Sequence, residues 1–366
     1  MSRAVIVGGG LAGATAALGL ARLGRAAVLL ERTVGPHDKM CGEFLSVEAA
    51  AGLTALGLDV RALGGTTIGT VRVMRGRRTV ESRLPFVATG LTRRTLDEAL
   101  LALATARGVT VERGVRVRSV GGGVVDTDRG EVQGDAVLLA TGKHDLHGRR
   151  RVLAGRQASL ADNIGFKMYF RATPALQRAL ADTVLIVVYE GGYAGVQLVD
   201  GRRVNLCLLV SPRRFAELGS SWEALVAALV AEPGLAMLAD ADPLLERPLS
   251  VSGVPYGYLA TPDPADPVYR LGDQAGVIPS FCGDGMAMAV HSGRLAAEAV
   301  HDGMGAPAYQ ARLRRDLAGP VHLAARVQRL TQHPWGQFLL MVGLGVMPGL
   351  LPVLARRTRV GDGFDG

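Results

Sequence analysis

The first thirty residues alternate between short apolar runs and a segment rich in glycine and alanine. The runs "AVIVGG" and "AAVLLER" are short and rich in branched side chains, which is typical of buried parallel strands. Between them, "GLAGATAALGLARLG" predicts a helix that ends at Gly24. The pattern therefore predicts a strand, a glycine turn, a helix and a second strand.

Helical and strand patterns then alternate. A helical stretch is expected from Val47 to Gly65, and "GTVRVMRGRRTVESRLPF" predicts a hairpin that turns at residues 75–77. "LTRRTLDEALLALATARGV" predicts an amphipathic helix capped by Thr92. From Ile164 to about Tyr258 strand patterns dominate, with one helix expected around Trp222. "VYRLGDQAG" predicts a further strand and turn, and a long helix should follow from Gly285 to Val300.

An uncharged run, "FLLMVGLGVMPGLLPVLA", lies near the C-terminus. Its length reaches the lower edge of a membrane-spanning segment, roughly 17 to 25 residues. Pro348 and Pro352 interrupt it, so two short helical pieces that cover the core or a ligand tunnel are expected. The alternatives are a surface that leans on a membrane and a true span.

The composition is that of a folded globular protein, with 48% hydrophobic and 20% charged residues among 366. Lysine occurs only at positions 39, 143 and 167, so the other 38 basic residues are arginines. They are scattered, and the net charge of +8 is therefore a weak signal for nucleic acid, which we do not expect as a partner. The dense runs "RGRR", "HGRRR" and "LARRTR" are read as solvated surface, or as a patch that attracts an anionic substrate or membrane.

Cysteine usage and the N-terminus point to a reducing compartment. Cys41, Cys207 and Cys282 are too few and too dispersed for a disulfide framework, and no metal-ligand spacing occurs, so no metal site is expected. The chain enters a buried strand almost at once, which leaves no room for a signal peptide. A cytoplasmic location is the resulting expectation.

Gly8, Gly10 and Gly13 form a GxGxxG pattern between the first strand and its helix. Such glycines let the backbone approach a pyrophosphate at a helix N-terminus. Glu31, followed by Arg32, ends the second strand at the distance expected of an acid that takes ribose hydroxyls. An acid there favours FAD or NAD over the phosphate-bearing NADP.

The segment "RLGDQAGVIPSFCGDGMAMAVHSGRLAAEAV" strongly resembles the second flavin fingerprint of FAD-dependent monooxygenases of the para-hydroxybenzoate hydroxylase type and of the related geranylgeranyl reductases. The resemblance implies that Asp273, after Gly272, binds the flavin ribityl chain. It also implies that Pro279 to Met286, with Gly283 and Gly285, lies along the isoalloxazine. A helix that starts near Gly285 would direct its positive end at the reduced flavin.

Two further segments resemble this superfamily, although the second differs from the family pattern at one position. "LTRRTLDEALL" resembles its Arg-x-x-x-Asp helix, which makes Arg93 a predicted contact of the flavin nucleotide. The turn Thr141-Gly142 stands where the hydroxylases usually carry Ala-Asp-Gly, and Lys143 and His144 follow it. The missing acid puts conventional nicotinamide docking in doubt.

"DKMCGEFLS" resembles the Lys-x-Cys-Gly segment that runs beside the flavin ring in geranylgeranyl reductases and kindred flavoproteins. Gly42 would allow close approach to the ring. Cys41 is then either a packing residue or a redox or proton-delivering neighbour of the flavin. Glu43 is either a general acid or base, if burial raises its pKa, or a hydrogen-bonded turn residue.

Several candidate residues carry weaker signals. His144 and His291 are candidates for a place near cofactor or substrate, although isolated histidines are more often structural, and Asp284 is expected to cap the helix that follows it. Tyr193, Gln197 and Asn205 are candidates for the pocket wall. The Gly-Trp-x-Trp-x-x-Pro signature of flavin-dependent halogenases is absent, which argues against halogenation.

The resemblance implies an α/β protein with a glutathione-reductase-like, Rossmann-type FAD-binding fold, an inserted antiparallel β-sheet substrate layer and a helical C-terminus. The expected FAD-binding domain has three segments, residues 1–72, 93–163 and 259–305. The other expected parts are a substrate-layer hairpin (73–92), a β-rich substrate domain (164–258) and a C-terminal helical region (306–366).

The first functional hypothesis is a monooxygenase of secondary metabolism that hydroxylates or epoxidises a small aromatic or polyketide-like molecule. NADH or NADPH would act as a transient reductant, since no second GxGxxG exists, or a separate reductase would deliver the electrons. The second is a reductase or dehydrogenase of carbon–carbon double bonds in an apolar substrate. The third is a non-catalytic binder of prenyl chains, as in Rab GDP-dissociation inhibitors.

Overall fold

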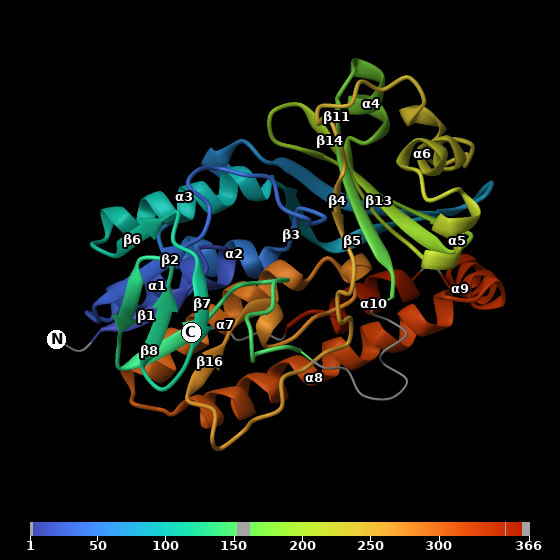
Figure 1. Ribbon diagram of the computed structural model, residues 1–366. Coiled ribbons are helices and arrows are strands. Elements are labelled where there is room, and N and C mark those ends of the chain that lie inside the picture. Colours follow the sequence, from blue (N-terminus) through green and yellow to red (C-terminus); the bar gives the residue numbers. More distant parts are fainter. Residues whose placement is uncertain (1–2, 152–161, 348, 361–366) are drawn as a thin grey trace.

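The computed structural model describes residues 3–151, 162–347 and 349–360 (Figure 1). One layer is a five-stranded sheet in which every neighbouring pair is parallel. Its strands, in spatial order, are β16 (Val268–Arg270), β10 (Ala136–Leu139), β1 (Ala4–Val7), β2 (Ala27–Glu31) and β6 (Thr110–Arg113). The central strands are buried on both faces, which is why the sequence shows continuous rather than alternating apolar runs.

Helices α1 (Leu11–Arg22), α2 (Val47–Ala55), α3 (Arg93–Ala106) and α7 (Gly285–His301) accompany this sheet. Small residues let α1 and α7 approach each other closely. A Cβ at Gly19 would lie 2.7 Å from the Cβ of Ala297, and one at Gly293 would lie 2.4 Å from the Ala12 carbonyl oxygen. The helices that follow the two glycine turns, far apart in sequence, therefore pack as one unit.

A second layer is an eight-stranded sheet, drawn at the upper right of Figure 1. Its strands, in spatial order, are β15 (Leu249–Val251), β11 (Ile164–Arg171), β14 (Arg203–Val210), β13 (Gly192–Val199), β12 (Asp182–Tyr189), β4 (Thr66–Arg75), β5 (Arg78–Gly90) and β3 (Phe44–Leu45). All pairs are antiparallel except β12 with β4. The predicted hairpin turn between β4 and β5 is confirmed, and so is the predicted fold class. A small third sheet contains β7 (Val117–Val120), β8 (Val124–Thr127) and β9 (Gly130–Gln133).

The helical predictions need three corrections. Helix α2 ends at Ala55, before the predicted Gly65, because Gly57 takes a φ of 89°. The β-rich segment holds α4 (Pro174–Ala179) and α5 (Pro212–Glu217) besides the predicted α6 (Trp222–Val230). Both extra helices start with a capping Thr173 or Ser211 followed by proline, a start signal that the strand pattern masked.

The C-terminal region forms α8 (Ala306–Thr331), α9 (Pro334–Val346) and α10 (Leu350–Arg357). The predicted division of the uncharged run into two helical pieces is confirmed, and α9 and α10 are bent by 114°. Among the described residues no single helix has the length and apolar character to cross a membrane, although α9 and α10 taken together have both.

Candidate functional site

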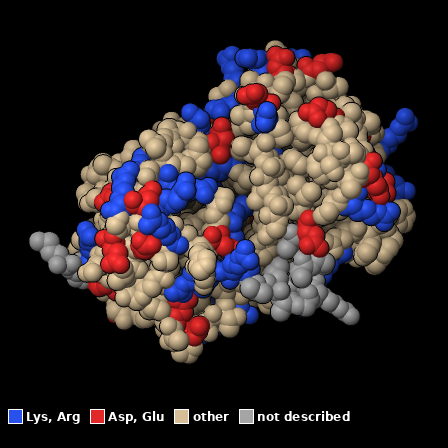
Figure 2. Space-filling view, in the orientation of Figure 1, with Lys and Arg blue, Asp and Glu red and all other residues tan. Residues whose placement is uncertain are grey.

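A cavity of about 1260 Å³ lies between the parallel sheet and the eight-stranded sheet. Figure 2 shows the surface hollowed between these two parts, with basic side chains around the hollow. The cavity exceeds the roughly 300 to 1,000 Å³ typical of a site for one small ligand. It therefore has room for a cofactor and a second molecule.

Most of the residues predicted to contact a cofactor line this cavity, although they come from six separate stretches of chain. The cavity-lining members of that set are Gly8, Gly10, Glu31, Arg32, Gly42, Arg93, Thr141, Gly142, Gly272, Asp273, Gly283, Gly285 and Met286. Cys41 and Glu43 line it too. Gly13 and Pro279 do not belong to the lining.

The three glycines of the first turn have different physical roles. A Cβ at Gly13 would lie 1.9 Å from the carbonyl oxygen of Gly8, and one at Gly8 would lie 2.4 Å from that of Ala140, so both positions are closed by the protein itself. Gly10 faces the cavity at the N-terminus of α1. A Cβ at Gly10 would lie 3.4 Å from Arg93 Nη2 and 3.7 Å from Lys39 Nζ. Two cations and the positive end of a helix thus meet at Gly10, which suits a pyrophosphate.

Asp97 holds both cations in place. Arg93 donates to it through Nε and Nη2, at 2.9 and 3.0 Å, and Lys39 Nζ lies 2.7 Å from Oδ2. Burial alone would raise the pKa of Asp97, but the charges of Arg93 and Lys39 lower it. The cluster is therefore ionised and keeps a net positive charge at the glycine turn.

Glu31 is buried at the end of β2, beside the same turn. Its Oε2 accepts from the Gly9 amide at 2.7 Å, and its Oε1 accepts from the amide and hydroxyl of Thr33 at 2.9 and 2.7 Å. Burial alone would raise its pKa, but these hydrogen bonds and the charge of Lys39 lower it. An ionised carboxylate at the cavity wall retains acceptor capacity for hydroxyl groups of a ligand.

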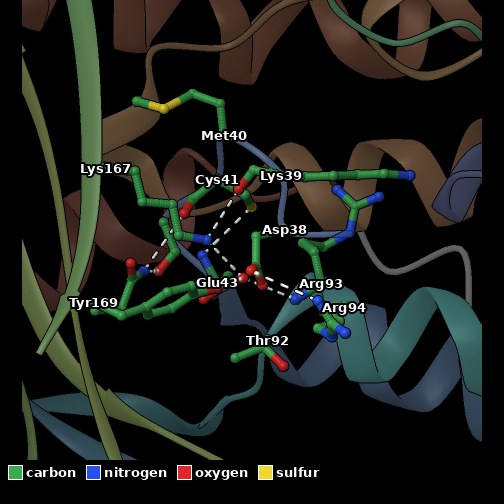
Figure 3. Close-up of polar contacts among 12 residues, drawn as sticks. Asp38, Lys39, Met40, Cys41, Glu43, Thr92, Arg93, Arg94, Lys167 and Tyr169 are labelled. Carbon is green, nitrogen blue, oxygen red and sulfur yellow. Dashed lines mark hydrogen bonds and ion pairs between the residues drawn. The ribbon is translucent and has the colours of Figure 1, made fainter. Parts of the chain in front are cut away.

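Side chains from distant elements bind the carbonyl oxygens of residues 39–43 (Figure 3). Lys167 donates to the carbonyl of Lys39 at 2.9 Å, and Lys143 donates to that of Met40 at 3.2 Å. The carbonyls of Gly42 and Glu43 accept from Asn205 and Gln197, at 2.7 and 2.8 Å. The segment is therefore fixed against both layers. A Cβ at Gly42 would meet nothing within 4 Å, so space is open in front of it.

Glu43 connects this segment to its surroundings through its side chain. Its Oε1 accepts from the Arg93 amide at 2.8 Å and the Tyr169 hydroxyl at 2.6 Å, and it pairs with Lys167 Nζ at 2.7 Å (Figure 3). Its backbone has a φ of 60°, which is unusual for a residue with a side chain. Burial raises the pKa of Glu43, and the charge of Lys167 opposes that shift. Among the described residues, Oε2 has no hydrogen-bond partner.

Cys41 is half-buried and not in a disulfide. Its Sγ accepts from the Glu43 amide at 3.3 Å. Its thiol interacts electrostatically with the Arg93 guanidinium and the Lys143 ammonium. The choice between a packing and a chemical role for Cys41 stays a prediction.

The turn before α7 and the turn after β10 face each other. Lys143 Nζ lies 3.5 Å from Asp273 Oδ2, and the charge of Asp273 raises the pKa of Lys143 against the opposing effect of burial. Gly142 and Gly285 both have open space where a Cβ would stand. The expected cap role of Asp284 is wrong, because its carboxylate makes no bond to α7 and instead binds Arg359 Nη1 at 3.0 Å and the Val360 amide at 2.8 Å.

The other part of the cavity is an aliphatic chamber, defined by side chains of the eight-stranded sheet and of α9 and α10. The chamber residues are Val71, Val73, Leu84, Val184, Ile186, Val188, Leu340, Leu344, Leu351 and Leu354. Elsewhere in the cavity lining, the Tyr193 and Ser280 hydroxyls hydrogen-bond each other, and burial raises the pKa of Tyr193 well above its usual range. Tyr193 is therefore a neutral hydrogen-bonding group.

The structure places some of the weaker candidate residues at the cavity and others away from it. Tyr193 and Gln197 line the cavity, whereas Asn205 lies behind it and holds Gly42. His291 is structural, since it is 5% exposed and bonds Asp316 at 2.9 Å. His144 lines the cavity and contacts Arg32.

The sequence matches no protein-family model and no curated protein. Among solved structures, the flavin-dependent brominase Bmp2 superposes with a TM-score of 0.79 at 18% identity, over 98% of this chain and 93% of Bmp2. The halogenase PltM in complex with phloroglucinol and FAD superposes with a TM-score of 0.75 at 15% identity, over 90% of this chain and 76% of PltM. PqsL of P. aeruginosa in complex with 2-aminobenzoylacetate superposes with a TM-score of 0.72 at 18% identity, over 89% of this chain and 94% of PqsL.

The fold is that of flavin-dependent oxidoreductases. At these identities the likeness concerns the fold alone, and the narrower resemblance to para-hydroxybenzoate hydroxylases and geranylgeranyl reductases stays a prediction. Within this flavoprotein fold, sequence reasoning missed Lys39 and Lys167. Their rarity was the available signal, because all three lysines of an arginine-rich chain hold or line the same segment.

Proposed function

We propose that this protein is an FAD-dependent monooxygenase that hydroxylates or epoxidises a small apolar or aromatic molecule. The observation that carries the proposal is a single cavity that joins the Gly10 turn to the aliphatic chamber. A ligand at the first end and a substrate at the second would therefore lie in direct contact.

The residues present fit FAD. Glycine backbone, Lys39 and Arg93 form a cationic cradle at the N-terminus of α1, and Glu31 supplies an ionised acceptor. Open space lies before Gly42 and Gly285, where a planar ring could approach backbone. The FAD complex of PltM, a protein of the same fold, supports this choice of cofactor.

Bound FAD would supply redox and oxygen chemistry to a substrate in the chamber. The protein's own groups would bind and orient the cofactor. Lys39 and Arg93 would hold the pyrophosphate, Glu31 the ribose, and Asp273 the ribityl chain. The positive end of α7 would stabilise negative charge on the ring, and the aliphatic chamber would exclude water.

The aliphatic chamber also favours the second candidate, a reductase of carbon–carbon double bonds. Its ten residues are all valine, leucine or isoleucine, which suit an alkyl or prenyl portion of a substrate. Neither candidate requires a second nucleotide-binding turn, since NADH or NADPH would reach the flavin transiently or a separate reductase would reduce it.

The test is the absorption spectrum of purified protein, followed by NADH or NADPH with and without oxygen. For a monooxygenase, the flavin absorbance bleaches anaerobically and returns on admission of oxygen, with oxygen consumed. A chemically reduced flavin that persists in air and is reoxidised by an unsaturated apolar compound supports the reductase instead. Bromide-dependent mass gain of an aromatic substrate would contradict both candidates and establish halogenation.

A further inference from the structure

Helix α9 has one buried face and one exposed apolar face. Its inner face carries Gln337, Met341 and Leu344, which are buried. Its outer face consists of Trp335, Phe338, Leu339, Val342 and Val346, whose exposed fractions are 59%, 45%, 52%, 37% and 75%. These positions recur at intervals of three and four residues, so they form one continuous stripe. An exposed stripe of this kind marks an interaction surface.

The C-terminal stretch that carries this stripe has charges of one sign. From Leu317 to Val360 the chain contains five arginines and no aspartate or glutamate. Arg326, Arg329, Arg356 and Arg357 are exposed, and none of the four forms an ion pair with a residue that the structure describes. The surface therefore combines apolar side chains with unneutralised positive charge.

We infer that the outer face of α9, together with the end of α10, docks on the surface of an anionic lipid bilayer. Tryptophan favours the boundary between headgroups and acyl chains, and the arginines are attracted to anionic headgroups. Charge argues against a second copy of this chain as the occupant, because two such faces would bring like charges together. The bent α9–α10 pair is also suited to lying in the interface rather than crossing it.

The same two helices separate this face from the chamber. Leu340 and Leu344 of α9 and Leu354 of α10 line the cavity, while Phe338, Leu339 and Val346 face outward. In Figure 1 both helices lie right of centre, beneath the eight-stranded sheet. Docking would thus place the chamber beside the hydrocarbon. The inference concerns binding alone and holds whichever redox reaction the site performs.

Trp335 provides a local probe, because the chain has only one other tryptophan. Trp222→Phe leaves Trp335 as the single emitter, and Trp222 lies elsewhere, beside Phe166. Phosphatidylglycerol-containing vesicles should shift the emission to shorter wavelength and sediment the protein, whereas pure phosphatidylcholine vesicles should do so far less. The double variant R356Q/R357Q should weaken vesicle binding about 30-fold, since each basic residue near an anionic surface contributes about fivefold.

Leu339→Glu with Val346→Glu should abolish the binding, and Val34→Glu is the matched control because Val34 is exposed, at 80%, outside this face. Thermal unfolding of each variant checks that the fold is intact. Absence of binding to anionic vesicles at low salt overturns the inference. So does wild-type protein that sediments as a dimer and becomes monomeric on Val346→Glu, which would assign the face to a second copy.

Discussion

The ammonium of Lys167 lies 2.7 Å from the carboxylate of Glu43, and neither side chain has exposed surface. Lys167 comes from β11 of the eight-stranded sheet, and Glu43 from the segment beside the glycine turns. The pair thus ties the substrate-side layer to the segment with the open space at Gly42. A buried ion pair specifies an arrangement more than it stabilises the fold, since desolvation offsets much of its Coulomb attraction.

Lys167→Met should be strongly destabilising, because it leaves a buried carboxylate without its counter-charge. Removal of one partner of such a pair typically costs about 3–5 kcal/mol. The measurement is the free energy of unfolding in urea. Glu43→Gln in the same chain should recover part of the loss, since the amide keeps an oxygen for Arg93 and Tyr169. A double variant no better than the single one would mean that the pair is not coupled.

The Lys167→Met defect should also grow with pH. Burial raises the pKa of Glu43, and loss of Lys167 removes an opposing effect. A raised carboxyl pKa means that the folded state binds the proton more tightly, so stability is highest below the unfolded pKa, near 4.5, and is lost as pH rises through the folded pKa. The difference from wild type should be larger at pH 8 than at pH 5. A constant difference would contradict this account.

Gly10 and Gly13 should respond differently to alanine although they belong to one motif. Gly13→Ala forces a Cβ against the Gly8 carbonyl oxygen and should lower stability by about 1–3 kcal/mol or more. Gly10→Ala has space within the protein and should leave the melting temperature of the apoprotein nearly unchanged, while FAD affinity falls. Differential scanning fluorimetry and FAD titration separate the two effects. Equal apoprotein destabilisation would contradict the distinction.

Lys39→Met should weaken FAD binding about tenfold, the loss expected for one charge-assisted hydrogen bond. Isothermal titration of apoprotein with FAD measures it. Arg25→Met is the matched control, because Arg25 is similarly half-buried and pairs with Asp135 at 2.6 Å away from the cavity lining. Equal affinities for wild type and Lys39→Met would remove Lys39 from the cofactor site.

Asp284 should make stability depend on pH near neutrality. Burial raises the pKa of its carboxyl to about 7, although Arg359 and the Val360 amide oppose the shift. The folded state therefore holds a proton that the unfolded chain releases, and this contribution to stability is lost as pH rises from about 4 to 7. Asp284→Asn should abolish that part of the slope. If the free energy of unfolding changed equally with pH in wild type and Asp284→Asn across this range, the account would be wrong.

Several features were determined by the sequence itself. The unit from Ala4 to Glu31 followed from local patterns, since buried parallel strands and a glycine turn leave signals within a few residues. The helix after Thr92 and the hairpin turn near Gly76 followed in the same way. Short helices α4 and α5 were missed because their proline starts lie inside strand-rich sequence.

Only the tertiary structure decided which side chains meet. That Asp284 binds Arg359 rather than capping α7, and that Lys167 and Tyr169 both reach Glu43, depends on residues 75 to 126 positions apart in the chain. No local pattern encodes such pairs, because they arise when two layers pack together. The sequence by itself thus determined the glycine turns and their strands. The packing of two sheets and the C-terminal helices decided the cavity, its buried charges and its exposed apolar face.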